Sequence, residues 1–573
     1  MRVFLAGLCA VSLVLSGCAL PGGAPLAGGQ APGPAVTKGQ VMVAAANPLA
    51  VEAGLAVLRR GGGAVDAAVA VQAVLGLVEP QSSGLGGGAF LVHYDSATGK
   101  VTAYDGRETA PASARPDMFM GPDGKPLGYV EAILSGRSTG APGAIAMLHM
   151  AHGDHGKLAW DSLFGDAERL ATEGFKVSPR LAGMIASPFP QTKTPDTVRY
   201  FTKPDGSRYV AGDVLKNPAY AASLRLIARD GPDGLLKGET AAAIIASVGA
   251  EPRGQVMTPA DLAGYRPLKK AALCHPYRVY LVCTAQPASS GVSLLQALAM
   301  LEKTDIASRG PTDPVAWIQI AEAERLMYAD RDRYVGDPDF VAVPVQGLLN
   351  PGYVAERAAL IGERFGPAPQ AGRPPGAQAR AADATLEPTG TSHMVIVDAD
   401  GDVVSMTTTV ESIFGSGRMA GGFFLNNQLT DFNFAPTDAD GTPAANAVAA
   451  GKRPRSSMSP VIVLDREGRF VAALGSPGGT SILSYNLKTL VGVLDWGLPM
   501  QEAIELPNLI ARGSGATGEA ARFAPGVVEG MAQRGLTLRA SGGENSGLHG
   551  VMVVNGRLTG GADPRREGVA RGW

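Results

Sequence analysis

One threonine stands at a position that could give it two chemical groups at once. Thr391 follows a segment rich in Pro and Gly at 366–390, and apolar runs at 395–397 and 403–410 are expected to be buried strands. If the bond between Gly390 and Thr391 is cut, the threonine becomes a new N-terminus. Its hydroxyl is then a nucleophile and its own α-amine is a base. The pattern predicts an enzyme that makes its active site by cutting itself.

Two glycine-rich segments each have a functional and a plain interpretation. Gly478 and Gly479 follow an apolar run at 470–474, where adjacent backbone N–H groups could hold the oxyanion of a tetrahedral intermediate. An ordinary glycine-rich turn would look the same. The segment 84–89 has the spacing of a dinucleotide fingerprint, but it leads from an expected helix into a strand, the reverse of a Rossmann loop. We therefore expect close backbone packing there and no cofactor.

Several polar loops could together hold an amino-acid headgroup. Gln428 and Asp431 offer an amide and a carboxylate for an ammonium group, and Ser456 and Ser457 offer hydroxyls for a carboxylate. Arg107 adds a planar guanidinium that can bind a carboxylate through two hydrogen bonds. Each loop alone could be only a polar turn. As a set they fit a ligand that carries both charges.

The elements that must position these residues are helices outside and strands inside. Residues 48–61 and 64–78 have helical rhythm, and 140–340 is expected to be mainly helical, including 314–334. This arrangement predicts an α/β (α+β) fold of the αββα sandwich type. Strands are expected at 89–94, 101–104, 391–398, 402–410, 461–465, 470–475 and 549–555.

Length and charge exclude some functions. The chain has 573 residues, of which 45% are hydrophobic and 18% charged, so it can bury a large core. Its net charge of −2 shows no basic excess, which argues against a nucleic-acid partner. None of the seven histidines forms a ligand pattern, and we expect no metal. His393, two residues after the predicted nucleophile, is expected to support its strand.

The first residues are expected to be a targeting segment. Residues 1–17 combine a short positive start with an apolar run too short to span a bilayer, and they read as a signal peptide. The run 15–18 looks like a bacterial lipobox, which would make Cys18 the lipidated first residue; an ordinary secretory signal is the alternative. Residues 18–38 then form a Gly/Pro-rich tether. We expect a periplasmic protein anchored by lipid, with Ala19 favouring the outer membrane.

Two further cysteines flank a short apolar segment. Cys274 and Cys283 are expected to lie around a strand or hairpin and could form a small-loop disulfide in an oxidising compartment. A zinc site is the poorer interpretation, since no Cys-x-x-Cys accompanies the pair.

Taken together, these features resemble the γ-glutamyltransferase (γ-glutamyltranspeptidase) family of N-terminal-nucleophile hydrolases. The resemblance covers residues 40–570. It is carried, in order, by GGGAVDAAVAV, PQSSGLGGGAF, YDGRETAP, YADRDRYVGDPDF, TSHMVIVDADGDVVSMTTTVESIFGSG, LNNQLTDF, KRPRSSMSP, GSPGGT and GADPRR.

The resemblance implies a precursor that cuts itself before Thr391 and remains together as a large subunit (39–390) and a small one (391–573). Residues 366–390 would be a flexible linker before the cleavage site. The enzyme would cleave glutathione or another γ-glutamyl donor through an ester on Thr391, and pass the glutamyl group to water, an amino acid or a peptide. The implied roles are nucleophile (Thr391), hydrogen bond to the nucleophile (Thr409), oxyanion donors (Gly478, Gly479), α-carboxylate binding (Arg107, Ser456, Ser457) and α-amino binding (Glu411, Gln428, Asp431).

Two other functions compete with this one. A related acylase would remove glutaryl or other side chains from β-lactam-type amides with the same threonine, but a glutaryl group lacks the amine for which Glu411, Gln428 and Asp431 are suited. A non-catalytic lipoprotein that binds amino-acid-like ligands would not need Thr391 or Thr409. The chain also departs from the family because 432–452 contains no tyrosine to close over the site. We therefore expect an open pocket in which hydrolysis competes well with transfer.

Overall fold

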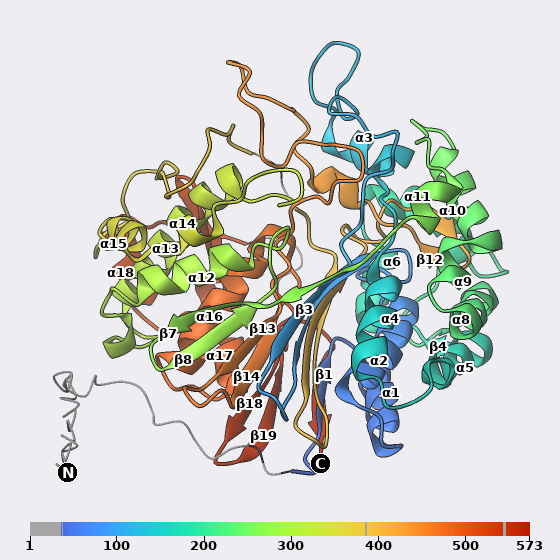
Figure 1. The fold of residues 1–573 in the computed structure, drawn as a ribbon, viewed down its shortest axis with the longest axis horizontal. Helices are drawn as coiled ribbons and strands as arrows, with labels where there is room; N and C mark the ends of the chain where they lie inside the picture. Colours follow the sequence, from blue (N-terminus) through green and yellow to red (C-terminus); the bar gives the residue numbers. More distant parts are fainter. Residues whose placement is uncertain (1–35, 37, 384, 386, 542–545) are drawn as a thin grey trace, which may run out of the picture.

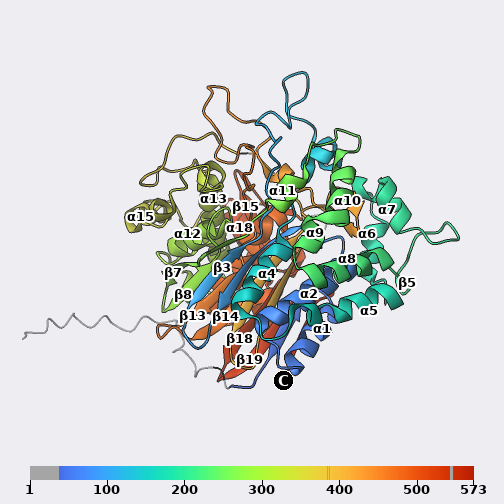
Figure 2. The same cartoon turned by 45° about the vertical axis from the view of Figure 1, so that its right-hand side comes forward.

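Two antiparallel sheets face each other at the centre of the molecule, and helices cover their outer faces (Figure 1). The turned view in Figure 2 shows the same order of layers. The computed structural model describes residues 36, 38–383, 385, 387–541 and 546–573. The expected signal peptide, Cys18 and nearly all of the tether lie outside the described residues.

The first sheet contains the predicted nucleophile strand at its centre. Its order is β20-β1-β9-β10-β2-β3-β6, and all neighbouring strands are antiparallel. Both β9 and β10 are buried along their whole length, as expected for strands covered on two faces. The strands are β20 (Val569–Gly572), β1 (Met42–Ala45), β9 (Thr391–Val397), β10 (Val403–Thr409), β2 (Gly88–Tyr94), β3 (Val101–Asp105) and β6 (Leu268–Ala271).

The second sheet packs against the first. Its order is β19-β18-β14-β13-β8-β7. At its edge, Cys274 of β7 and Cys283 of β8 lie opposite each other and form a disulfide. The strands are β19 (Arg557–Ala562), β18 (His549–Val554), β14 (Phe470–Gly475), β13 (Val461–Leu464), β8 (Tyr280–Thr284) and β7 (Leu273–Tyr277).

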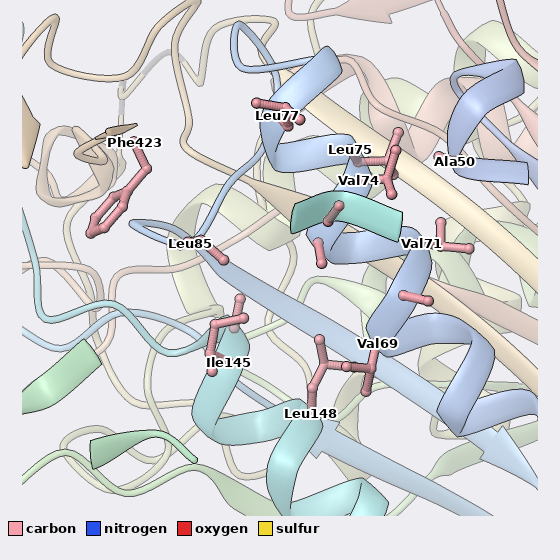
Figure 3. Packing of buried hydrophobic residues seen from close by; sticks show 14 of the residues in the cluster. Ala50, Val69, Val71, Val74, Leu75, Leu77, Leu85, Ile145, Leu148 and Phe423 are labelled. Atoms are coloured by element: carbon pink, nitrogen blue, oxygen red, sulfur yellow. The ribbon is translucent and has the colours of Figure 1, made fainter. Parts of the chain in front are cut away.

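Three apolar layers hold the sandwich together. The layer between the sheets includes Phe90 and Val395 from the first and Ile462 and Ala473 from the second. Helix α2 is buried at every residue and packs on α4 (Figure 3). Ala and Val dominate α2, so it can lie flat on the sheet while α1 and α4 cover it. The described layers confirm the predicted αββα fold.

The helices divide between the two outer faces. On the first sheet lie α1 (Pro48–Arg59), α2 (Ala64–Val78) and α4 (Ala144–His155). Farther out on the same side are α5 (Gly165–Glu173), α6 (Pro179–Ile185), α7 (Pro195–Tyr200), α8 (Pro218–Asp230), α9 (Asp233–Leu236), α10 (Gly238–Gly249) and α11 (Pro259–Ala263). On the second lie α12 (Gly291–Leu301), α13 (Pro314–Tyr334), α14 (Val345–Leu348), α15 (Pro351–Ala358), α16 (Ile482–Leu494), α17 (Met500–Glu505) and α18 (Val527–Gln533).

Short elements complete the chain. Helix α3 (Tyr129–Leu134) lies at the top of the molecule as drawn in Figure 1. The remaining strands are β4 (Phe175–Lys176), β5 (Val214–Leu215), β11 (Met419–Ala420), β12 (Phe423–Phe424), β15 (Leu509–Arg512), β16 (Gly515–Gly518) and β17 (Leu538–Ala540).

No helix among the described residues is long and apolar enough to cross a membrane.

The predicted helices at 64–78 and 314–334 have the observed bounds, and the expected strands agree to within one residue at each end. Strands β6, β7 and β8 interrupt the region expected to be mainly helical. The pair β7 and β8 is the strand or hairpin expected between Cys274 and Cys283. Strand β6 was not predicted, because Leu268–Ala271 has no continuous apolar run to mark it.

Candidate active site

Thr391 begins β9, and its hydroxyl lies against a second threonine hydroxyl. The strand register places it opposite Thr409, the last residue of β10. The two Oγ1 atoms are 3.0 Å apart, and both residues are buried. Thr409 Oγ1 also lies 2.7 Å from the carbonyl oxygen of Gly390 and accepts a 2.8 Å hydrogen bond from the backbone N–H of Glu411.

These contacts define the direction of each hydrogen bond. A hydroxyl has one proton to donate, and the Gly390 carbonyl can only accept, so Thr409 donates to Gly390. Thr391 must then donate to Thr409. The arrangement polarises the carbonyl of the Gly390–Thr391 peptide and draws the proton of Thr391 away from the carbonyl that it would attack. In this structure that peptide bond is intact.

The backbone around the bond is tightly held. A Cβ atom at Gly390 would lie 2.2 Å from the carbonyl oxygen of Glu411, so no larger residue fits there without displacement. Arg566 donates a 2.9 Å hydrogen bond to the carbonyl oxygen of Thr391. Glu411 itself has φ +82°, a left-handed conformation that is uncommon for a non-glycine residue. Arg566 lies in the GADPRR segment, which supported the resemblance but was given no role.

Gly478 and Gly479 lie beneath the chain that precedes the cleavage site. Their φ values are +137° and +55°, which favour glycine. A Cβ atom at Gly479 would lie 2.2 Å from the carbonyl oxygens of both Glu387 and Pro388. Thr480 N donates to the Glu387 carbonyl at 3.1 Å. The segment before Thr391 therefore packs directly on Gly479, one of the two predicted oxyanion donors, in the uncleaved chain.

The structure brings together the predicted ammonium-binding residues. Gln428 and Asp431 lie on the short 3-10 helix Gln428–Asp431 (η5). The amide Nε2 of Gln428 donates to Glu411 Oε2 at 2.6 Å and to Asp431 Oδ2 at 2.8 Å. Arg107 Nη2 lies 2.5 Å from the same Asp431 oxygen. One acceptor on each side chain, Glu411 Oε1, Gln428 Oε1 and Asp431 Oδ1, is buried without a hydrogen-bond partner.

The cluster holds three carboxyl groups, those of Glu108, Glu411 and Asp431, around the single guanidinium of Arg107. Burial, followed by the charge of Asp431, raises the pKa of Glu411 well above its ordinary value. Burial also raises the pKa of Asp431, although Arg107 opposes the change. Adjacent to Arg107, burial raises the pKa of Glu108 to about 8, and both of its carboxylate oxygens lack hydrogen-bond partners. A bound cation with N–H donors would satisfy several of these atoms at once.

The predicted carboxylate-binding residues lie on the adjoining loop. Arg107 Nε and Nη2 donate to the carbonyl oxygens of Pro454 and Arg455 at 3.0 and 2.6 Å, which ties the arginine to the serine loop. Ser456 Oγ accepts from Met458 N at 3.1 Å and so shapes the turn. The backbone N–H of Ser457 donates to Glu387, and its hydroxyl accepts from Arg331.

Glu387, four residues before Thr391, was not singled out in the sequence. Its carboxylate accepts a 2.9 Å hydrogen bond from Ser457 N and pairs with Arg331, which lies 2.6 Å from Ser457 Oγ. Arg455 is 3.8 Å away. Burial alone favours the neutral acid, but the two arginines dominate and lower the pKa of Glu387. The signal available in the sequence was an acidic residue, one of only two at 366–390, in a segment otherwise rich in Pro, Ala and Gly.

Residues 366–390, which we expect to be a flexible linker, make buried contacts with the rest of the uncleaved chain. Asp383 pairs with Arg455 at 3.0 Å and accepts from Asn446 at 3.0 Å. Farther back, Gly372 N donates to Asp330 at 2.8 Å. Composition suggested flexibility because Pro and Gly cannot form a core, but buried ion pairs and backbone hydrogen bonds hold the segment instead.

His393 is a strand residue in this site. Its Nδ1 lies 2.9 Å from Thr407 Oγ1 on the neighbouring strand. Burial, with a smaller contribution from His549, lowers its pKa well below the ordinary value. Within the described part of the chain, no group of three or more His, Cys, Asp or Glu side chains is arranged to hold a metal ion.

Comparisons with known proteins identify relatives along nearly the whole chain. The profile of a family described as gamma-glutamyltranspeptidase matches residues 50–573. The glutathione hydrolase proenzyme of Bacillus subtilis (strain 168) is 34% identical over 548 residues, covering 93% of this chain and 91% of that protein. Acylase ACY 1 proenzyme of Pseudomonas sp. (strain SE83) is 33% identical, covering 92% of each. The crystal structure of cephalosporin acylase from Bacillus halodurans shares the fold, with a TM-score of 0.79, 24% identity and coverage of 98% and 99%.

Proposed function

The chain belongs to the gamma-glutamyltranspeptidase family, and we propose that it is a self-processing γ-glutamyltransferase and glutathione hydrolase. The observation that carries this proposal is the hydrogen-bonded group of Thr391, Thr409 and the Gly390 carbonyl. A non-catalytic binding protein has no need of a nucleophile already placed against a scissile peptide.

Self-cleavage uses the groups in contact. Thr391 Oγ1 attacks the carbonyl carbon of Gly390, and its proton leaves toward Thr409. Thr409 stabilises the charge that develops on the Gly390 oxygen. The peptide C–N bond then breaks, the nitrogen of Thr391 takes a proton, and Gly390 is held as an ester on Thr391. Water hydrolyses this ester, releasing a carboxylate at Gly390 and a free α-amine at Thr391.

Turnover repeats this chemistry on a γ-glutamyl amide. The α-amine of Thr391 takes the proton of its own hydroxyl, and the oxygen attacks the γ-carbonyl. Gly478 and Gly479 supply N–H groups to the oxyanion once the preceding segment has moved off Gly479. Collapse expels the amine of the donor and leaves a γ-glutamyl ester. Water completes hydrolysis, and we propose that amino acids or peptides accept the glutamyl group in transfer.

The acidic cluster supports a γ-glutamyl donor over a glutaryl one. Glu411, Gln428 and Asp431 leave three buried oxygens unpaired, and Arg107 leaves Nη1 without a hydrogen bond. An α-ammonium and an α-carboxylate would satisfy these groups. A glutaryl substrate offers no ammonium, so the buried acceptors would remain unpaired, at about 1–3 kcal/mol for each. Because one relative is named an acylase, acylase activity is the second candidate function.

Hydrolysis of a γ-glutamyl anilide and a glutaryl anilide by the processed protein separates the two candidates. We expect the γ-glutamyl compound to be cleaved with the higher kcat/KM. Equal rates, or faster cleavage of the glutaryl compound, would leave the scaffold in place and refute the substrate assignment.

We propose that the enzyme acts in the periplasm, held to the outer membrane by lipid on Cys18. The support is the lipobox-like run ending at Cys18 and the Gly/Pro-rich tether after it. Cys18→Ala should move the protein from the membrane fraction to the soluble periplasmic fraction. An unchanged distribution would exclude the lipid anchor.

A further inference from the structure

A tyrosine that the sequence did not single out reaches the ammonium-binding cluster from the large-subunit side. Tyr129 is the first residue of α3, and α3 contacts η5, the short helix that carries Gln428 and Asp431. The residue is half-buried, yet its hydroxyl oxygen is fully enclosed. The polar end of the side chain therefore points into the protein.

The surroundings of that hydroxyl are those of the acidic cluster. It faces the hydroxyls of Ser412 and Thr430, and the charges of Glu411 and Asp431 act on it. No described atom completes a well-aligned hydrogen bond to the Tyr129 oxygen. Both neighbouring hydroxyls accept from the Asn427 amide at 3.0 Å, and Thr430 donates its own proton to the Asn427 carbonyl at 2.7 Å.

Apolar contacts hold this tyrosine in place. The segment before α3 packs on the loop after η5 through Phe119 and Phe434, whose rings stack at a centroid distance of 4.6 Å. Leu127 and Ala132, on either side of Tyr129, belong to the same cluster as Leu429. In Figure 1 the segment before α3 and the loop after η5 stand together at the top of the molecule. Tyr129 is thus fixed between two segments that both border the site.

We propose that Tyr129 is a specificity-determining residue whose hydroxyl binds the α-ammonium of the donor together with Glu411, Gln428 and Asp431. This inference rests on the proposed function and adds a residue to its substrate site. A phenolic oxygen can accept from the ammonium and donate its own proton to a neighbouring carboxylate. It would thereby reduce repulsion between the acids while adding a contact that a glutaryl group cannot make.

The position explains how a chain without a tyrosine in 432–452 can still place a phenol at the site. The aromatic residue comes from the large subunit, at the first position of α3, instead of from the small-subunit loop. Since the contact is to a part of the substrate that does not react, it should contribute equally in the ground state and the transition state. Removing this contact should therefore raise KM while changing kcat little.

The test compares two substrates on two Tyr129 variants and one control variant. Tyr129→Phe keeps the ring and removes the oxygen. We expect kcat/KM for the γ-glutamyl anilide to fall about tenfold, mostly through KM, because a hydrogen bond to a charged group is lost. The glutaryl anilide should be cleaved at an unchanged rate. Tyr94→Phe is the matched control, since Tyr94 donates to Gly468 at a strand end outside the site.

Each outcome decides the matter. Unchanged γ-glutamyl kinetics in Tyr129→Phe, or an equal loss on both substrates, would overturn the assignment. The second of these results would show that the tyrosine only supports the fold. A second variant, Tyr129→Leu, must repeat the selective loss. If the wild-type enzyme itself shows no preference for the γ-glutamyl anilide, the proposed function fails first, and the wild-type data alone reveal it.

Discussion

Replacing Thr409 with valine tests the self-cleavage geometry most directly. Valine keeps the shape of threonine but removes the hydroxyl that contacts Thr391 Oγ1, the Gly390 carbonyl and Glu411 N, at 3.0, 2.7 and 2.8 Å. The Gly390 oxygen then loses the donor that would stabilise its developing charge. Removal of one such donor from an oxyanion site slows a reaction about 10²–10³-fold. We expect self-cleavage of Thr409→Val to slow by this factor.

The stability of the variant must be measured alongside. The buried Glu411 N–H would lose its acceptor, which costs about 1–3 kcal/mol. That loss is too small to unfold a chain with three packed apolar layers, but it should lower the melting temperature. Circular dichroism and thermal unfolding check that a slow variant is a folded one.

Denaturing electrophoresis over time after purification measures the cleavage. Wild-type protein should appear as two chains, and Thr409→Val should persist as one. Thr408→Val is the matched control, because the neighbouring hydroxyl makes only a 3.4 Å contact with the Gly88 carbonyl. We expect it to be processed like the wild type. Wild-type processing of Thr409→Val would refute the role assigned to that hydroxyl.

Three further predictions concern the uncleaved chain and its supports. Thr391→Ala should remain a single inactive chain; two bands on a denaturing gel would exclude this nucleophile. In that uncleavable background, Glu387→Gln should lower the free energy of unfolding by about 3–5 kcal/mol at pH 7, because Arg331 and Arg455 lose their buried partner. Since these arginines lower the pKa of Glu387 to about 2, its contribution is complete above the unfolded-state pKa of about 4.3 and is lost as the pH falls toward 2. Urea unfolding should therefore show a smaller difference at pH 3 than at pH 7, and an equal difference at both would contradict the ion pairs. Replacing Cys274 and Cys283 by serine should lower stability by about 2–4 kcal/mol without changing cleavage; an unaltered urea midpoint would show that the disulfide adds nothing.

Local patterns predicted much of the architecture. Helical rhythm at 64–78 and 314–334 and the apolar runs of β9 and β10 are properties of consecutive residues, so they can be seen without knowing the neighbours. Strand β6 has no such run. It forms because β3 offers a partner for its backbone, which is information from elsewhere in the chain.

In the candidate site, too, some features could be predicted from the sequence and others depend on the fold. Thr391 could be found from the sequence, since its chemistry needs only a hydroxyl at a bond that can be cut. Its partner Thr409 and the acid Glu411 were assigned from a family resemblance, whereas Gln428 and Asp431 were also suggested by their side-chain types. The structure shows that these residues lie together. Their proximity depends on the pairing of β9 with β10 and on the docking of η5.

What the sequence alone determined was the type of chemistry and the elements that carry it. The tertiary structure decided which charges meet. It placed Glu387 on Arg331 and Ser457, so that a segment expected to be flexible is anchored over the site. It also brought Tyr129 to the acidic cluster from a distant segment. Periodicity records whether a residue is buried, whereas the identity of its partner is decided by packing between segments that are far apart in the chain.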